Sequence, residues 1–211
     1  MRAKGDHAVR FVPMSGEIAH AKGTDGTSRA KRWLERTTRA KVPWVQPDPA
    51  AVRKLTFRKP NGSFSFDLGG VLHGGEFDKQ EFLAEVKNYK DASDQPVLYR
   101  EFIAKCYRAY SERPERCDHF MWITWAPFNA TEWSKLDSCD KVKHCVRECW
   151  QFNFTSKEQA DGAILDSGIV KEVADRIWLL VLSEKQIDHL SMSDEYLSVI
   201  AMHEVLAEAK K

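Results

Sequence analysis

The alternation of apolar and polar positions is clearest in the second quarter of the chain. Two apolar-rich runs, at 64–72 and 81–89, flank a polar, glycine-containing segment at 73–79. Runs of this length on either side of a turn predict an antiparallel hairpin. If the turn is centred on the middle of that segment, residues that face each other have position numbers that sum to about 152, because antiparallel partners run in opposite directions. Asp67 then faces Glu85.

The segments around the hairpin predict a mixed α/β fold. Positions 52–59 alternate apolar and polar residues, and Asn61-Gly62 is a strong two-residue turn signal, so we expect a three-stranded meander that includes the first run of the hairpin. Apolar residues then repeat every four positions and predict a helix over about 96–112, with Lys105 on its exposed side. The apolar run 120–125 predicts a buried strand parallel to the second run of the hairpin.

The C-terminal third predicts more helix and one further strand. We expect helices at 140–151 and, interrupted at Gly162 or Gly168, at 158–174, a buried strand at 177–182, and closing helices at 184–190 and 194–209, the last capped by Ser193. The predicted fold class is therefore α/β, with a central mixed sheet flanked by helices. We expect a flexible lead-in over 1–26 and a single domain over 27–211, with a core at about 53–126 and an extension at about 130–211.

A basic helix is predicted near the N-terminus. Thr27-Ser28 can cap it, and apolar residues recur at helical spacing through about Ala40. Its remaining faces carry many cations against one acid, Glu35, in a chain whose net charge is +1. Such a face is either simply solvated or contacts phosphates, and the candidates for phosphate contact are Arg29, Arg32, Arg36 and Arg39. Prolines then predict a non-helical connector at 43–49.

The predicted hairpin gathers charged residues on one face. Asp67 and Glu85 lie opposite each other, and Lys87 projects from the same face as Glu85 because side chains alternate along a strand. Two facing carboxylates repel each other, but a divalent cation reverses that interaction. We therefore expect Asp67 and Glu85 to bind Mg²⁺ or Mn²⁺, with the Val86 carbonyl as a third ligand. Lys87 would orient the attacking water or stabilise the phosphate.

The pattern Asp67, then Glu85-Val86-Lys87 in an apolar strand followed by a helix, resembles the PD-(D/E)xK superfamily of metal-dependent nucleases. The resemblance covers about 53–126 and departs from the family name at Phe66, where that name has proline. It implies a restriction-endonuclease-like core with an N-terminal basic helix and a C-terminal helical extension. It also implies that an early helix supplies an acidic residue near the metal, for which Glu35 is the candidate.

Other interpretations of this region stay open from the sequence alone. Glu85 and Lys87 can be polar residues on the solvent side of a strand, with Asp67 capping a glycine turn. One of the nearby acids, Glu76, Asp78 or Glu81, can replace Asp67 as a ligand, and His73 can carry protons near the turn. The aromatic residues Trp122, Trp125, Phe128 and Trp133 either stack on bases or pack in the core.

Composition narrows the class of protein. The isoelectric point near 7.7 argues neither for nor against nucleic acid, so any basic surface must be local. No apolar run approaches the roughly 20 residues that span a bilayer, and we expect a cytoplasmic protein with no membrane partner. Five cysteines at irregular spacing suit reduced thiols. A structural zinc site would use His144 and three of them, Cys139, Cys145 and Cys149, against the ordinary alternative of helix cysteines packed in the core.

The expected activity is that of a metal-dependent endonuclease acting on DNA. A restriction, defence or mobile-element system is the setting that the superfamily resemblance allows. The alternative is a non-catalytic nucleic-acid-binding or assembly subunit that uses the basic helix to hold phosphates. Cutting both strands of a duplex normally requires two sites, so a homodimer or a partner protein is expected.

Overall fold

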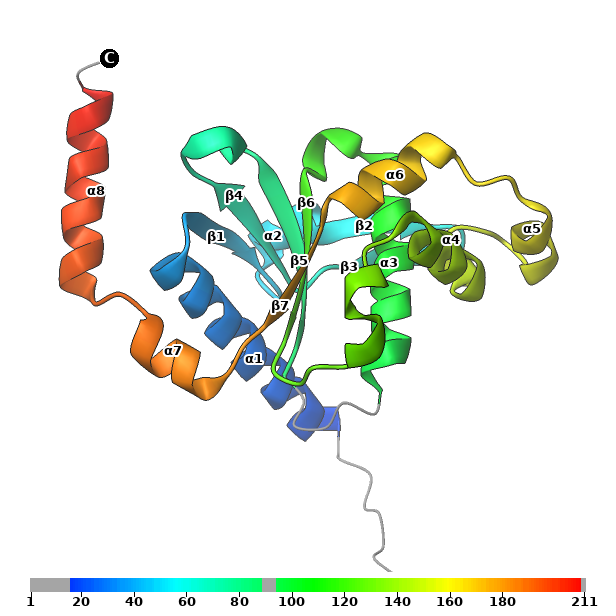
Figure 1. Ribbon diagram of the computed structural model, residues 1–211, viewed down its shortest axis with the longest axis horizontal. Coiled ribbons are helices and arrows are strands. Elements are labelled where there is room, and N and C mark those ends of the chain that lie inside the picture. The colour runs from blue at the N-terminus through cyan, green and yellow to red at the C-terminus, as the bar shows by residue number, and fades with distance from the viewer. Residues whose placement is uncertain (1–15, 89–93, 210–211) are drawn as a thin grey trace, which may run out of the picture.

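A five-stranded mixed sheet forms the centre of the computed structural model, which describes residues 16–88 and 94–209. Its strands lie in the order β1 (Ala40–Val45), β4 (Leu68–Leu72), β5 (Glu81–Lys87), β6 (His119–Thr124) and β7 (Ile177–Val181). The pairs β1–β4 and β4–β5 are antiparallel, whereas β5–β6 and β6–β7 are parallel. Figure 1 shows this sheet between helices on both sides, so the predicted α/β class is confirmed.

Alternate residues of β5 face two separate apolar layers. Leu83 packs in the layer that contains α3 (Gln95–Glu112), α4 (Cys139–Glu148) and α6 (Ser167–Asp175). Its neighbours Phe82 and Ala84 pack in the layer that contains α1 (Gly16–Thr37). Because strand side chains alternate, the faces of the sheet are thereby assigned: odd positions of β5 face α3 and even positions face α1.

The remaining elements lie at the margins of these layers. They are α2 (Pro49–Leu55), the hairpin β2 (Thr56–Lys59) and β3 (Gly62–Ser65), α5 (Lys157–Gly162), α7 (Glu184–Leu190), α8 (Asp194–Glu208), and 3-10 turns at Gly75–Phe77, Pro114–Arg116, Ala130–Lys135 and Trp150–Phe152. Within the described residues, no helix is both long and apolar enough to cross a bilayer.

The central hairpin has the predicted register. Leu68 faces Ala84 and Gly69 faces Leu83, so paired positions sum to the expected value. One residue before β4, the Asp67 amide donates to the Ala84 carbonyl at 3.0 Å and continues the ladder. The structure therefore brings Asp67 beside the Glu85 position.

The predicted three-stranded meander is wrong. The turn at Asn61-Gly62 joins β2 and β3 as expected, but these two strands form a sheet of their own. The start of the predicted strand is the helix α2, because the Asp48 side chain accepts a hydrogen bond from the Ala50 amide at 2.9 Å and Pro49 occupies the first turn.

The N-terminal prediction was also incomplete. The helix α1 already begins at Gly16, inside the lead-in that we expected to be flexible, and ends at Thr37; residues 1–15 of that lead-in lie outside the described part. The first half of the predicted connector is the edge strand β1, where Pro43 is tolerated because an edge strand needs no complete set of amide donors.

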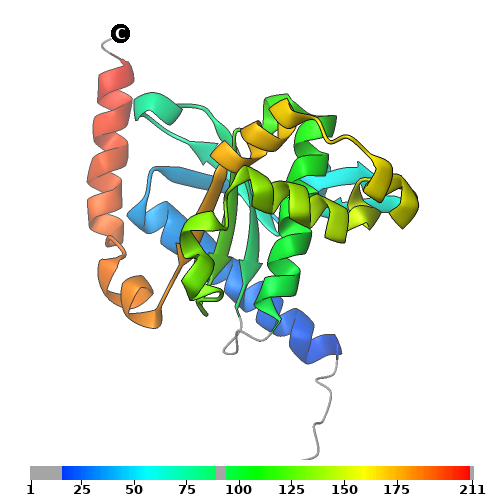
Figure 2. The same ribbon diagram turned by 45° about the vertical axis from the view of Figure 1, so that its right-hand side comes forward.

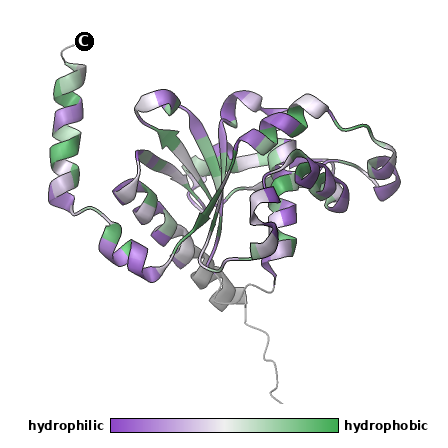
Figure 3. Ribbon diagram, in the orientation of Figure 1, coloured by the Kyte–Doolittle hydropathy of each residue, from purple (hydrophilic) through white to green (hydrophobic). Residues whose placement is uncertain are grey.

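The predictions for the C-terminal half hold closely. The helices α3 and α4, the parallel strands β6 and β7, and a helix break directly after Gly162 are confirmed. Ser193 caps α8, since its hydroxyl accepts from the Tyr196 amide at 3.5 Å. Figure 2 shows α8 standing apart from the sheet, and Figure 3 shows its green, apolar residues on several sides.

Candidate active site

Asp67, Glu85 and Lys87 lie together at one end of the β4–β5 pair. Glu85 and Lys87 occupy odd positions near the carboxyl end of β5 and therefore face the α3 side of the sheet. Asp67 reaches them from the residue before β4, where its Oδ2 accepts a hydrogen bond from the Val86 amide at 2.7 Å. The three side chains that the sequence predicted to share a face do so.

Glu85 is a buried carboxylate with two lysines on one oxygen. Its exposed fraction is 5%, and its Oε1 accepts from Lys87 Nζ at 2.8 Å and from Lys105 Nζ at 3.1 Å. Burial alone would raise its pKa, but the charges and hydrogen bonds of Lys87 and Lys105 outweigh burial and lower the pKa below its usual range. Its other oxygen, Oε2, is buried without a hydrogen-bond partner in the described part of the chain.

Lys105 is the residue of this cluster that the sequence prediction misplaced. We expected it on the exposed side of α3, yet its side chain is only 14% exposed and contacts Glu85. It lies seven residues after Leu98 and three after Phe102, so helical spacing puts it at the margin of the apolar stripe. That spacing was the available signal, because a lysine stem can lie along an apolar surface while its ammonium reaches a buried acid.

Asp67 experiences the repulsion that the sequence analysis anticipated. Burial and, next, the negative charge of Glu85 raise the pKa of Asp67 to about 6, against the opposing effects of Lys87, the Val86 amide and Lys105. Asp67 and Glu85 are thus close enough to titrate together. A bound cation would remove this repulsion.

The donor set fits a hard divalent cation that keeps several water ligands. Two carboxylates are present, one of them with a buried oxygen that no donor satisfies. In residues 16–88 and 94–209, no third acid, histidine or cysteine completes the cluster. Mg²⁺ and Mn²⁺ accept such partial shells, because Mg²⁺ in particular is commonly held by one or two carboxylates with waters. The Val86 carbonyl stays a predicted ligand.

Glu35 is not part of this site, which corrects the implied accessory role. It lies on α1, on the opposite side of the sheet, where Oε1 accepts from the Val42 amide at 3.1 Å and lies 3.7 Å from Lys31 Nζ. These contacts attach α1 to the edge strand β1. The sheet itself therefore separates Glu35 from Asp67.

The four basic-helix arginines do not form one surface. Arg29 pairs with Glu184 and lies over the Trp125 ring at 5.1 Å, and Arg36 pairs with Asp194. Arg32 and Arg39, together with Arg36, line a pocket between α1 and α8. Phosphate contact by these arginines stays a prediction, and the structure makes Arg32 and Arg39 the ones without an internal acid among the described residues.

The acids considered as substitutes for Asp67 have other partners or positions. Glu81 opens β5 and accepts from Arg116 at 3.1 Å, with Lys54 at 3.7 Å. Asp78 accepts from the Gly74 amide at 2.7 Å, and Glu76 is exposed in the turn. None of them neighbours Glu85 along the sheet as Asp67 does.

A further polar pair extends the site toward β6. Thr124 is paired with Lys87 in the parallel register, and its hydroxyl accepts from Gln95 Nε2 at 2.5 Å. The Gln95 side chain is fully buried, and its Oε1 has no hydrogen-bond partner in the described part of the chain. No sequence signal marked Gln95, because a glutamine at the start of a helix is usually exposed to solvent.

The aromatic and cysteine candidates belong largely to the core. Trp122 and Phe128 pack with Tyr99 in the α3 layer, with Trp133 against that layer, while Trp125 is partly buried on the other side. The zinc alternative finds no support in the described residues, where no group of three ligands forms. Burial raises the thiol pKa of Cys145 to about 12 and that of Cys149 to about 11, as expected for cysteines that pack as small apolar residues.

Asp67→Asn is expected to stabilise the metal-free protein at pH 8 by about 2 kcal/mol, and most of this gain should vanish at pH 4. The folded pKa of about 6 lies above the value of about 4 in an unfolded chain. The proton on Asp67 therefore favours folding below about pH 4, and this contribution is lost as pH rises through 6. Urea unfolding in chelator at both pH values measures the difference. Equal pH dependence in variant and parent would contradict it.

Comparison with known proteins adds a weak structural similarity. No family model matches the chain, and no curated protein sequence matches it. The Cap4 SAVED/CARF-domain containing receptor of Moraxella osloensis is similar in structure, with a TM-score of 0.35 and 11% sequence identity. The match covers 80% of this chain and 34% of the receptor chain, so the chain spans about a third of the receptor's length. A similarity this low supports no inference about activity.

Proposed function

We propose that this protein is a metal-dependent phosphodiesterase that cleaves DNA as an endonuclease. The observation that carries the proposal is the geometry of one carboxylate pair. Asp67 lies one residue before β4 and contacts the adjacent strand β5, which carries Glu85, and the buried Oε2 of Glu85 has no donor in the described part of the chain. Two acids held together at the cost of repulsion suit a cation better than they suit a structural role.

The residues of the chain have separate tasks in this proposal. Asp67 and Glu85 hold Mg²⁺ or Mn²⁺, which when bound supplies Lewis acidity and lowers the pKa of water. Lys87 and Lys105 keep Glu85 ionised, since both ammonium groups contact the same oxygen. Lys87 also lies next to the β6 terminus, where it can orient a water or a phosphate oxygen.

A cleavage assay tests the proposal directly. The purified chain is incubated with supercoiled DNA, linear duplex, single-stranded DNA and RNA, in Mg²⁺, in Mn²⁺ and in chelator. We expect nicking or linearisation of supercoiled DNA only with metal, because the two carboxylates alone cannot activate water. Absence of scission of every substrate in both metals would overturn the proposal.

The charge network supports one second candidate function. Lys87 and Lys105 already neutralise Glu85 through its Oε1 without metal, as in a purely structural ion pair. On this alternative the protein is a non-catalytic nucleic-acid-binding or assembly subunit. Salt-dependent binding of DNA without scission in either metal would favour it. A homodimer, a partner protein and a restriction, defence or mobile-element setting stay proposals under either function.

A further inference from the structure

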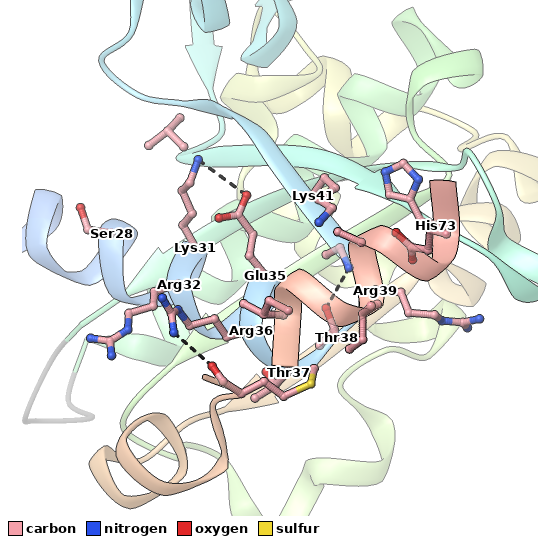
Figure 4. Close-up of a pocket in the computed structure, with 17 residues that line it drawn as sticks. Ser28, Lys31, Arg32, Glu35, Arg36, Thr37, Thr38, Arg39, Lys41 and His73 are labelled. Carbon is pink, nitrogen blue, oxygen red and sulfur yellow. Dashed lines mark hydrogen bonds and ion pairs between the residues drawn. The ribbon is translucent and has the colours of Figure 1, made fainter. Parts of the chain in front are cut away.

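A pocket of about 830 Å³ lies on the side of the sheet opposite Asp67 and Glu85. Its walls are the C-terminal half of α1, the edge strand β1, His73 after β4, and one face of α8. In Figure 4, α8 crosses in front of the side chains that α1 and β1 contribute. A volume of this size suits a small organic ligand, because ligand sites commonly enclose about 300–1,000 Å³.

The charge in the pocket is unbalanced. Its lining contains five cations, Lys31, Arg32, Arg36, Arg39 and Lys41, and two acids, Glu35 and Glu204. Lys31 lies near Glu35, and Arg36 pairs with Asp194. The other three cations are exposed and have no ion-pair partner among residues 16–88 and 94–209. Arginine and lysine side chains gathered in a concave site favour a phosphate-bearing ligand.

The walls of the pocket are fixed to each other without a ligand. Arg36 Nη1 donates to the Met192 carbonyl at 3.0 Å, and the Met192 amide donates to the Arg36 carbonyl at 3.1 Å, so the segment before α8 is attached to α1. Lys31 Nζ donates to the Val42 carbonyl at 2.7 Å and attaches α1 to β1. A ligand therefore meets a formed site and has little chain to order.

Arg39 owes its position to a glycine. A Cβ on Gly75 would lie 2.5 Å from Arg39 Nη1 and 3.0 Å from Nη2, so the guanidinium packs directly against the Gly75 backbone. Gly75 also has a φ of +68°, a conformation that side chains rarely adopt. The His73 amide donates to the Arg39 carbonyl at 3.0 Å, which fixes the same loop to the end of α1.

The wall that α8 contributes is apolar except for Glu204. Leu197, Ile200 and Ala201 follow helical spacing and line the pocket, and Ile200 remains 42% exposed. The pocket thus offers cations on one side and an aliphatic surface on the other. A nucleotide matches both, since its phosphates need the cations and the face of its base can lie on aliphatic side chains.

We propose that the pocket between α1, β1 and α8 is a nucleotide-binding site, separate from the carboxylate pair. Arg39 and Lys41 contact the phosphates, and Leu197 and Ile200 contact the base. This assignment does not depend on the proposed nuclease activity, because the two sites lie on opposite faces of the sheet.

Calorimetric titration of the full chain tests the site with ADP, pyrophosphate and a short DNA duplex as probes. ADP should bind, and more tightly than pyrophosphate. The double substitution Arg39→Gln with Lys41→Gln should weaken ADP binding by about tenfold or more. Ala201→Trp should weaken it similarly by filling the pocket, without removing any charge. The matched control, Arg53→Gln with Lys135→Gln, removes two exposed cations outside the pocket and should leave the affinity unchanged.

Several results would overturn the assignment. The first is the absence of ADP binding at concentrations up to about 1 mM. The second is an equal loss of ADP affinity in the pocket variants and in the control, which would indicate unspecific charge attraction. If pyrophosphate binds as tightly as ADP, the apolar wall contributes nothing to affinity, and the site is not specific for a nucleotide. If the pocket substitutions weaken the duplex and not ADP, the pocket is a contact for polymeric DNA instead.

Discussion

Glu85→Gln is expected to lower metal-dependent DNA cleavage by roughly 10²–10³-fold, the usual loss when one preorganised electrostatic group is removed. Glutamine keeps the shape of the side chain but removes the charge that would bind the cation, and it places an amide where Oε2 now lacks a donor. The measurement is the initial rate of nicking of supercoiled DNA in Mg²⁺. Activity within threefold of the parent would contradict the assignment.

Glu85→Gln also removes the acid that pairs with Lys87 and Lys105, which lowers stability as well as activity. A second substitution separates these two effects. Asp67→Asn should show the opposite combination, because it relieves repulsion and stabilises the apo fold while it removes a cation ligand. If Asp67→Asn unfolds at a higher urea concentration than the parent and no longer cleaves DNA, its loss of activity does not result from a loss of stability. Glu76→Gln, an exposed acid in the turn of the same hairpin, is the matched control and should cleave like the parent.

The carboxylate pair could be predicted because it depends on local pattern. The position of the turn between two apolar runs fixes which residues face each other, and the observed pairing of Leu68 with Ala84 follows that rule. Alternation along β5 then places Lys87 with Glu85. No long-range information is needed for these two steps.

The separation of β2 and β3 from the main sheet could not be predicted in the same way. It depends on contacts between distant segments, since the rings of Phe57, Phe64 and Phe66 cluster together and Phe66 packs edge-on against Phe102 of α3. The chain therefore turns between β3 and β4 instead of continuing as one strand. The alternation of apolar residues indicates that these rings are buried, but it does not indicate which residues they pack against.

The contact of Lys105 with Glu85 could not be predicted from the sequence for the same reason. A lysine in a helix is usually solvated, and only the fold reveals that Lys105 of α3 reaches the buried carboxylate of Glu85. The position of Glu35 away from the site likewise depends on the arrangement of helices around the sheet. Because α1 and α3 cover opposite faces of the sheet, an acid on α1 cannot reach a residue that faces α3.

Gly70→Ala is expected to destabilise the protein by about 3 kcal/mol or more, the scale of a core substitution that forces backbone to move. A Cβ at this position would lie 1.9 Å from the Lys41 carbonyl oxygen and 3.0 Å from the Phe82 ring. The edge strand β1 crosses β4 there, beside the irregular register between Lys41 and Trp44. Because the obstacle is backbone, no side-chain rotation relieves it, and β1 must shift or detach.

Urea unfolding followed by tryptophan fluorescence measures the loss, and Gly162→Ala is the control. No heavy atom lies within 4 Å of a Cβ at Gly162, so that substitution should change stability by less than about 1 kcal/mol. Equal midpoints for Gly70→Ala and the parent would show that β1 does not approach β4 as described. Since β5 pairs with the other edge of β4, the register that joins Asp67 to Glu85 should survive in Gly70→Ala. At low temperature, where Gly70→Ala remains folded, the variant should therefore keep its metal-dependent cleavage. This result would show that Gly70 is needed for the packing of the strands, whereas Asp67 is needed for the reaction.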